Sequence, residues 1–225
     1  MIQVQLISFT PDPERVIALA ARQTRSERVI SAEQLSEDEI RRIIDLLMKL
    51  KHMSPFEHAV FTFSISGISR VCSHQLVRHR LASFSQQSQR AVKIKESSFI
   101  IPPSIQTNLE ARKVFEELVS QSIKAYNKLI ELGIPIEDAR FVIPQAIETK
   151  IVVTMNAREL LHFFGLRLCR KAQWEIRQLA EKMLESLIKI APNVFKYAGP
   201  RCWDYGYCPE GDEQCFKEMI KRKKP

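Results

Sequence analysis

Ile151-Val152-Val153-Thr154 is a short β-branched run, and the chain passes from it almost directly into the helical pattern Ala157-Arg158-Glu159-Leu160-Leu161-His162-Phe163-Phe164. β-Branched residues favour strands, whereas apolar residues spaced three and four apart favour an amphipathic helix. A strand that leads into a helix in this way predicts a fold that mixes the two kinds of element.

The segments on both sides continue this alternation. Two more strands are predicted at residues 2–9 and 60–65, and further helices at residues 14–25, 37–51, 109–132 and 172–190. Ser36 is a suitable N-cap for the second of these helices, and Gly133 ends the third. The fold class is therefore α/β or α+β. No internal repeat or Gly/Ser linker interrupts residues 1–225, which predicts a single domain whose tail, residues 195–225, is irregular, basic and contains cysteines.

The composition narrows the classes of partner. Lys and Arg number 34 against 26 Asp and Glu, and the resulting net charge of +8 favours anionic ligands. None of the 6 glycines forms the pattern of a glycine-built phosphate site, so arginine side chains must bind any nucleotide. No apolar run approaches the roughly 20 residues that span a membrane, and residues 1–6 do not resemble a signal peptide. We therefore expect a cytoplasmic protein that binds no membrane.

The cysteines number 5, and an odd number without an export signal indicates reduced thiols. Cys202, Cys208 and Cys215 lie in the tail without a CxxC pair, so a zinc site there would need a fourth ligand from elsewhere in the chain. Free thiols or a local disulfide are the simpler interpretation, and no metal site is predicted. The basic run at residues 221–224 is interpreted as a solvated end.

The densest polar stretch of the chain is Arg78-His79-Arg80-Leu81-Ala82-Ser83-Phe84-Ser85-Gln86-Gln87-Ser88-Gln89-Arg90. The planar fork of arginine matches phosphate and imide oxygens, and hydroxyl and amide groups add neutral donors. Between residues 46 and 109 only Glu57 and Glu96 are acidic, so these arginines have few local partners. An anion-binding site is favoured over the alternative, which is a solvated basic surface with a Ser/Gln loop.

This stretch resembles the signature of the flavin-dependent thymidylate synthases, Arg-His-Arg-x-x-Ser-x-Asn-Glu-x-Ser-x-Arg. It matches the signature at Arg78, His79, Arg80, Ser83, Ser88 and Arg90. It departs from the signature at Ser85 and Gln86, where the family has Asn-Glu. Without the carboxylate at position 86, proton transfer beside a pyrimidine should be affected more than nucleotide binding.

Other segments resemble the same family in the same order. His52-Met53-Ser54-Pro55-Phe56-Glu57-His58 is similar to its His-x-Ser/Thr-Pro-Phe-Glu-His element, and Asp138-Ala139-Arg140-Phe141-Val142-Ile143-Pro144 to its Ala-Arg-x-x-Leu-Pro turn. Residues 156–167 resemble its Asn-Ala-Arg-x-Leu-x-[Asn/His]-Phe-x-x-Leu-Arg element, and Ala172-Gln173-Trp174-Glu175-Ile176 matches the element that follows.

Two of these segments also have purely structural readings. Ser54 and Glu57 stand at the N-cap and N3 positions of a capping box, which by itself would explain both residues. A metal site from His52, Glu57 and His58 is not predicted, because their spacing is not HExxH. On an ideal helix Asn156 and Arg167 return to within about 20° of one face. Arg158 and His162 share another face, so one helix would present polar groups to two ligands.

The resemblance implies reductive methylation of dUMP to dTMP by a homotetramer with active sites at the subunit interfaces, and helices around a central mixed or antiparallel sheet. Methylenetetrahydrofolate would donate the carbon, and FAD reduced by NADPH would carry the hydride. By correspondence with the family, dUMP would be bound by Gln75, Leu76, Val77, Arg78, Gln86, Gln87, Ser88, Gln89, Arg90, Arg140 and Arg167. FAD would be bound by Ser54, Arg78, His79, Arg80, Gln86, Asn156, Ala157, Arg158 and His162, and His52 would contact folate or NADPH.

Arg167 is the candidate catalytic residue. No cysteine follows a proline, so the cysteine nucleophile of the unrelated thymidylate synthases is missing and uracil must be activated electrostatically. A guanidinium against the imide would stabilise the ionised ring and place electron density on the carbon to be methylated. Two alternatives stay open. One is a related flavin-dependent methylase of another uracil nucleotide such as UMP. The more distant one is a basic protein that binds nucleic acid through residues 78–90, although no nucleic-acid-binding fold motif supports it.

Overall fold

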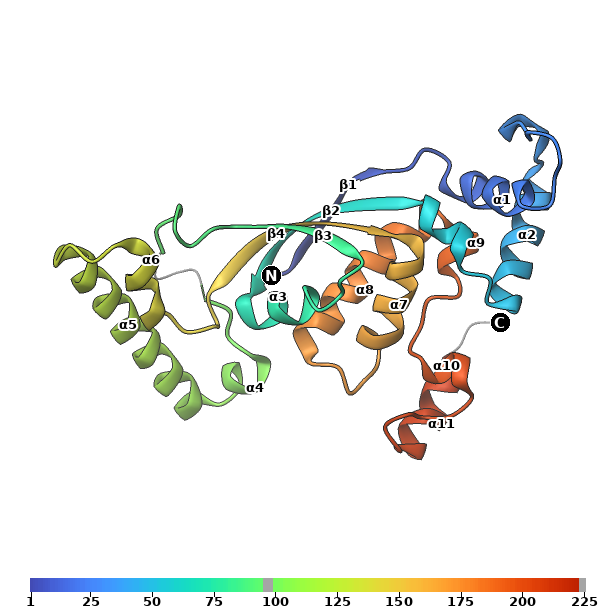
Figure 1. Cartoon of the computed structure of the whole chain (residues 1–225). Coiled ribbons are helices and arrows are strands. Elements are labelled where there is room, and N and C mark those ends of the chain that lie inside the picture. The colour runs from blue at the N-terminus through green and yellow to red at the C-terminus, as the bar shows by residue number, and fades with distance from the viewer. Residues whose placement is uncertain (95–98, 223–225) are drawn as a thin grey trace. The chain divides into compact units, whose positions relative to one another are not determined.

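The computed structural model describes residues 1–94 and 99–222, and Glu96, Lys223 and Lys224 lie outside the described residues. Its strands are β1 (Gln3–Phe9), β2 (Val60–Ser69), β3 (Ala82–Gln86) and β4 (Glu148–Asn156), which form one sheet in the order β1-β2-β4-β3 (Figure 1). The sheet is antiparallel: the backbone N–H after the end of β1, at Thr10, donates to Val60 O at the start of β2 at 2.9 Å. The three predicted strands and the mixed fold class are confirmed, and β3 is an addition to them.

The chain divides into two compact units, and β2, β3 and β4 each pass from one unit into the other. The first unit comprises Met1–Gln3, Ile65–Arg78 and Phe84–Val152, and the second comprises Val4–Ser64, His79–Ser83 and Val153–Pro225. The single domain expected from the sequence stays a prediction.

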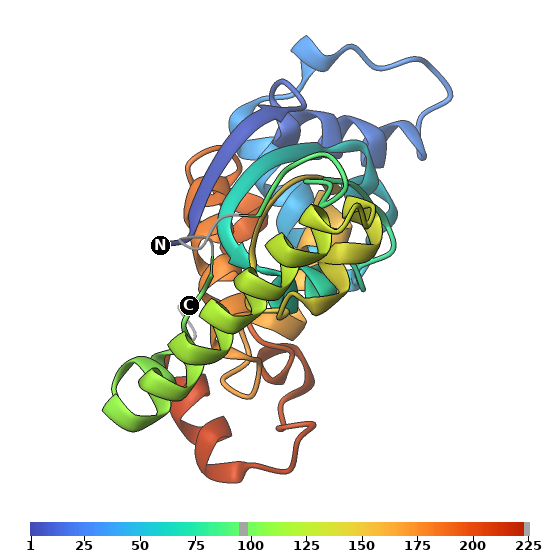
Figure 2. The same ribbon diagram turned by 90° about the vertical axis from the view of Figure 1, so that its left-hand side faces the viewer.

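The first unit carries the longest helix of the described chain, α5 (Leu109–Glu131; Figures 1 and 2). The Asn108 side chain caps it by accepting the N–H groups of Glu110 and Ala111, and the chain leaves it through Gly133, which has a φ of 80°. The other helices of this unit are α3 (Arg70–Leu76), α4 (Pro103–Gln106), α6 (Ile136–Ala139) and the 3₁₀ helix η3 (Arg140–Val142). The sequence predicted α5 but not α3, which contains only seven residues.

The second unit holds the remaining long helices. These are α1 (Pro13–Gln23), α2 (Glu37–Leu50), α7 (Ala157–Arg167) and α8 (Trp174–Ile188), with the short elements η1 (Ala32–Gln34), η2 (Ser54–His58) and α9 (Pro192–Phe195). Aromatic rings join these elements in the core: Phe164 lies edge-on to Phe163 and Phe195, at centroid distances of 5.5 and 6.1 Å. Both Glu14 carboxylate oxygens accept hydrogen bonds from Asn193, which fastens α1 to the start of α9. This packing fixes α7, which carries several of the predicted site residues.

The structure corrects one predicted cap and confirms another. Ser36 caps α2, and Glu39 completes a capping box with it. At residues 54–57 the expected capping box is wrong: Ser54 begins a 3₁₀ helix after Met53 and makes no cap. The Glu57 side chain instead pairs with Arg158. A capping box needs the serine at the N-cap position, whereas Ser54 is already the first residue of the 3₁₀ helix.

The tail contains two short helices where an irregular segment was expected. They are α10 (Cys202–Tyr205) and α11 (Glu213–Lys221), at the red end of the ribbon in Figures 1 and 2. Asp212 caps α11 by accepting the N–H of Cys215. No helix in the described residues is both long enough and apolar enough to cross a membrane.

Candidate active site

His79 lies between Glu159 and Arg167 in the second unit and forms a hydrogen bond with each of them. Its side chain is only 3% exposed. Arg167, the last residue of α7, donates from Nε to His79 Nε2 at 3.2 Å. Because Nε2 accepts, the ring proton lies on Nδ1, which donates to Glu159 Oε1 at 3.2 Å. The imidazole is therefore a fixed neutral link between Glu159 and Arg167.

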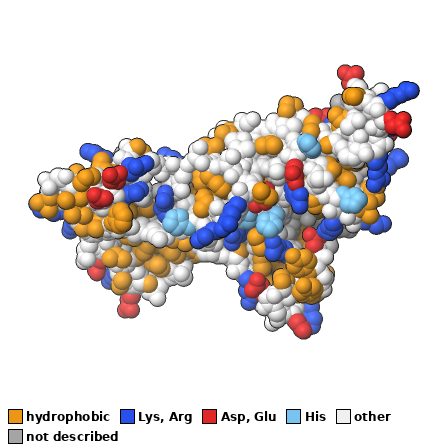
Figure 3. All heavy atoms as spheres, in the orientation of Figure 1, with side chains coloured by type: hydrophobic (Ala, Val, Ile, Leu, Met, Phe, Trp, Pro, Cys, Tyr) orange, Lys and Arg blue, Asp and Glu red, His pale blue; other side chains and the backbone are white. Residues whose placement is uncertain are grey.

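The electrostatics of this group favour the neutral histidine. Burial, with the nearby positive charge of Arg167, lowers the pKa of His79 to about 4. Burial likewise lowers the pKa of His162, helped by Arg201 and Arg167, and raises the pKa of Glu159. Near pH 7 the guanidinium groups are thus the cations of this cluster, and Figure 3 shows basic and histidine side chains close together over α7.

Arg201 belongs to the same cluster, although the sequence analysis did not select it. Its Nη2 donates to His162 Nδ1 at 3.4 Å, and its backbone N–H donates to Gly165 O at 3.0 Å. A Cβ on Gly165 would lie 3.2 Å from Arg201 Cγ. A glycine inside a helix costs about 1 kcal/mol relative to alanine, so Gly165 was the one signal in the sequence that another segment packs closely here.

His79, Glu159 and His162 also bring three potential metal-ligand atoms within 4.8 Å of one another. A cation is disfavoured there because Arg167 and Arg201 lie beside both imidazoles. The cluster is instead suited to an anionic or polar ligand that can accept hydrogen bonds from guanidinium groups.

The start of α7 places the other predicted FAD residues on this helix. Asn156 is the N-cap, and its Oδ1 accepts the N–H of Glu159 at 2.9 Å. Ala157 is fully buried, so only its backbone can contact a ligand. Asn156 and Arg167 lie at opposite ends of the helix, about 16 Å apart along its axis, and the structure does not bring them into contact. Their shared face therefore suits a long ligand rather than a small one.

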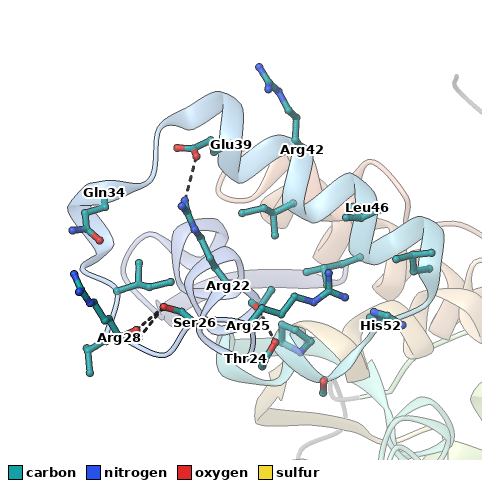
Figure 4. A pocket seen from close by; sticks show the side chains of 18 residues that line it. Arg22, Thr24, Arg25, Ser26, Arg28, Gln34, Glu39, Arg42, Leu46 and His52 are labelled. Carbon is teal, nitrogen blue, oxygen red and sulfur yellow. Dashed lines mark hydrogen bonds and ion pairs between the residues drawn. The ribbon is translucent and has the colours of Figure 1, made fainter.

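His52 and Ser54 line a cavity of about 820 Å³ between α1, α2 and the loop that joins them (Figure 4). Four arginines also line it, Arg22, Arg25, Arg28 and Arg42, against one acid, Glu39. Arg22 pairs with Glu39 at 3.2 Å, and Figure 4 shows Arg25 extending beneath α2 towards His52. Apolar side chains complete the wall, among them Val29, which is 92% exposed, and Leu46 and Leu50. A cavity that pairs exposed apolar side chains with arginines is suited to an anionic ligand with an aromatic body.

In the first unit, Gln86 lies in a small polar network at the end of β3. Its Nε2 donates to Ser73 Oγ at 2.9 Å and to Thr149 Oγ1 at 3.1 Å. The next three residues, Gln87, Ser88 and Gln89, line a pocket of about 250 Å³ against β4. Three consecutive residues of the predicted dUMP set thus line one pocket, and Gln86 precedes them.

A second basic group of the first unit contains one residue that the sequence analysis missed. Burial, with the adjacent charge of Arg140, lowers the pKa of Arg70. Arg140 donates from Nε to Glu137 O at 3.0 Å, and Arg90 pairs with the Glu137 carboxylate at 3.6 Å. No carboxylate pairs with Arg70 within residues 1–94 and 99–222, so two guanidinium groups stand close together without full compensation. Such a pair is suited to a phosphate.

The rest of the predicted set is distributed over α3 and the segment after it. Leu76 is fully buried and can offer only its backbone, whereas Val77, Arg78 and Arg80 are exposed. Gln75 lies on α3 and is half-buried. Arg78 ends one segment of the first unit and His79 begins a segment of the second, so the signature stretch contributes to both units.

The described residues form a mixed α/β fold that carries clusters of arginine side chains suited to anionic ligands. Residues 5–193 match the family model described as thymidylate synthase complementing protein. Over 226 residues the chain is 50% identical to the flavin-dependent thymidylate synthase of Geobacter sulfurreducens, an alignment that covers 98% of this chain and 97% of the relative. It is 45% identical over 236 residues to the enzyme of the same name from Pyrococcus furiosus, covering 99% and 96% of the two chains. The chain belongs to the family of flavin-dependent thymidylate synthases, which confirms the resemblance seen in the sequence.

A solved structure has the same fold. It is a UMP/dUMP methylase, PolB from Streptomyces cacaoi, bound with 5-Br dUMP, and it superposes with a TM-score of 0.79 at 24% identity. The match covers 88% of this chain and 94% of that one.

Proposed function

We propose that this protein methylates dUMP reductively to dTMP, with methylenetetrahydrofolate as the carbon donor and FAD, reduced by NADPH, as the hydride carrier. Membership of a family of flavin-dependent methyltransferases supports the reaction class. The observation that carries the proposal is the hydrogen bond from Arg167 to a neutral, buried His79. It orients a guanidinium without adding a second positive charge beside it.

In this proposal Arg167 activates the uracil. A guanidinium fixed through its Nε can present its planar fork to an imide edge, which stabilises negative charge on the ring and makes the carbon to be methylated more nucleophilic. Glu159 orients His79 from the other side and so acts as a positioning residue. A cysteine nucleophile is not required, and Cys72 on α3 is fully buried.

Residues of the first unit are suited to bind a nucleotide phosphate. Arg70, Arg90 and Arg140 supply charge, and Ser88 supplies a hydroxyl beside the pocket of Gln87 and Gln89. Gln86 would hold this segment in place through Ser73 and Thr149 rather than act on a proton.

The cavity of His52 and Ser54 fits the anionic cofactors. Its volume of about 820 Å³ is within the range of ligand pockets, roughly 300–1,000 Å³, and it carries one residue from the FAD set and the residue assigned to folate or NADPH. Bound FAD would supply hydride chemistry, while Ser54 and Arg25 would hold its charged part or that of a co-substrate. We place the enzyme in the cytoplasm as a homotetramer with active sites at its interfaces, and sedimentation of the flavin-loaded protein tests the assembly.

Anaerobic turnover tests the proposal. The reduced protein is mixed with methylenetetrahydrofolate and either dUMP or UMP, and the nucleotide product is identified by mass spectrometry. We expect a flavin-containing protein that forms dTMP from dUMP. Methylation of UMP alone would identify the related methylase. A colourless protein that retains nucleic acid and methylates neither nucleotide would favour the basic binding protein.

A further inference from the structure

Four of the cysteines lie in neighbouring segments around the end of α7, in a part of the second unit that the proposed reaction does not use. Cys169 follows α7 by two residues, and Cys202 begins α10. The backbone N–H of Arg201 donates to Gly165 O at 3.0 Å, which fastens the start of α10 to the last turns of α7. This bond brings Cys202 close to Cys169.

Two ion pairs bring Cys215 to the same place. Lys171 pairs with Asp212 at 2.8 Å, and Arg170 pairs with Glu218. Asp212 and Glu218 flank Cys215 along α11, while Arg170 and Lys171 directly follow Cys169. The two pairs therefore hold the segment that carries Cys215 beside the segment that carries Cys169.

Cys208 completes the group from the loop between α10 and α11. Trp203 donates from Nε1 to Met219 O at 2.9 Å, so the two helices that flank this loop are tied together. Burial raises the pKa of the Cys202 thiol, and the nearby Cys169, Cys208 and Cys215 raise it further; burial likewise raises the pKa of Cys215, with Cys169 and Cys208 among the neighbours that raise it further. All four cysteines have free thiols, and Cys202 is buried while the others are half-buried.

We propose that Cys169, Cys202, Cys208 and Cys215 form a structural zinc site that fastens the tail to α7. Four cysteines are one of the ligand sets that bind structural zinc, and Cys169 is the fourth ligand that the tail by itself lacks. Zn²⁺ would replace the four thiol protons, giving one tetrathiolate complex and releasing up to four protons to solvent.

Binding must draw the sulfurs together. With Zn–S bonds of about 2.3 Å the sulfurs of a tetrahedral site lie about 3.8 Å apart. In the described part of the chain only His79, Glu159 and His162 bring three potential ligand atoms within 4.8 Å, so the four sulfurs are more widely spaced than in a closed site. The loop that carries Cys208 lies between Gly206 and Gly211, whose φ angles of 73° and 71° allow conformations that other residues adopt rarely. Because Cys169, Cys202 and Cys215 by themselves are also more widely spaced than in a closed site, we expect both the loop and the side chains of these three cysteines to move inwards when the metal binds.

The site would also act on the active-site cluster through one bond. Arg201 precedes Cys202 directly and donates to His162. Zinc at Cys202 would hold Arg201 in this position, so it would give the tail a positioning role without contact to the substrate.

The test uses full-length protein, expressed with zinc and purified under reducing conditions. We expect one zinc per chain by elemental analysis, and a tetrathiolate visible spectrum after exchange with Co²⁺. The combined variant Cys169→Ser and Cys208→Ser should contain at least tenfold less zinc. Its control, Cys72→Ala, removes a cysteine of the first unit and should retain the metal.

Three outcomes would overturn the proposal. The first is wild-type protein without zinc whose four thiols react freely. The second is a disulfide between two of the four that persists through purification under reducing conditions. The third is full zinc content in the double variant. If the double variant folds poorly, chelation of the wild-type protein replaces it, and an unchanged melting temperature on metal removal counts against the site. Metal content does not depend on dUMP turnover, so this result is independent of the proposed reaction.

Discussion

Arg167 Nε lies 3.2 Å from His79 Nε2 and donates a hydrogen bond to it, although the two residues are 88 positions apart. The bond requires an unprotonated Nε2, and burial beside Arg167 supplies that state by lowering the pKa of His79 to about 4. A buried histidine thus serves as a rigid acceptor that orients a guanidinium, and the predictions below follow from this arrangement.

The pKa of His79 predicts how stability depends on pH. In the unfolded chain His79 takes up its proton near pH 6.5, whereas the folded protein resists protonation down to about pH 4. Between these values the unfolded state binds more protons, so the free energy of unfolding falls as the pH falls, by up to about 1.4 kcal/mol per pH unit for this one group. Urea unfolding from pH 4 to 8 should show a shallower slope for His79→Gln than for the wild type. Equal slopes would mean that His79 is not held neutral by the fold.

Arg80 should contribute to flavin affinity. It is exposed, and a charge-assisted hydrogen bond typically contributes about 1.5–3 kcal/mol, so Arg80→Ala should weaken FAD binding about 10- to 150-fold. Arg41→Ala is the matched control, because Arg41 pairs with Asp38 at 2.9 Å on the exposed side of α2. Flavin retention is measured by absorbance after dialysis. Loss of flavin in both variants alike would remove Arg80 from the cofactor site.

Gln86 tests the departure from the family signature. Its amide donates to Ser73 and Thr149, which a carboxylate cannot do, although the hydroxyls can then donate instead. We expect Gln86→Glu to fold, to change the rate of flavin oxidation less than threefold (roughly 0.7 kcal/mol in the barrier), and to weaken dUMP binding through the added negative charge. The test measures the single-turnover rate of flavin oxidation and, separately, the dUMP affinity by titration. A large gain in rate at unchanged dUMP affinity would instead assign proton transfer to this position.

Arg25 should contribute to the binding of one anionic co-substrate. It extends into the cavity of His52 and Ser54 and forms no ion pair within the described residues. Arg25→Gln should raise the KM for either methylenetetrahydrofolate or NADPH about tenfold, the loss of roughly 1.4 kcal/mol. Arg41→Gln serves as the control. The co-substrate whose KM rises identifies the occupant, and unchanged KM values with unchanged flavin affinity would leave the cavity without a role in turnover.

The local elements were accessible from the sequence because short-range rules determine them. The Ser36 cap of α2 and the glycine that ends α5 depend on neighbouring residues alone. β3 was missed because its composition, Ala-Ser-Phe-Ser-Gln, has low strand propensity, and pairing with β4 decides its conformation.

The same distinction applies to the site. His79, His162 and Arg167 lie in segments whose residue order resembles the family, so they could be predicted, but the bond between Arg167 and His79 could not. Arg201 and Arg70 come close to their partners only through folding, since 39 residues separate Arg201 from His162. The segment that follows Cys169 is likewise joined to α11 by two ion pairs that no spacing rule indicates.

The measurement that tests the account most directly is single-turnover oxidation of reduced flavin by Arg167→Ala, with dUMP and methylenetetrahydrofolate present. The variant should fold and keep its flavin, but flavin oxidation and dTMP formation should slow about 10²-fold or more, because one preorganised donor to developing charge is removed. Arg167→Lys should restore little of the rate, since an ammonium cannot reproduce the planar fork. If Arg167 only complemented the dipole of α7, its replacement by alanine would lower the stability by about 0.3–1 kcal/mol and leave the rate unchanged. Near-normal flavin oxidation and dTMP formation in Arg167→Ala would contradict the assignment of Arg167 to uracil activation.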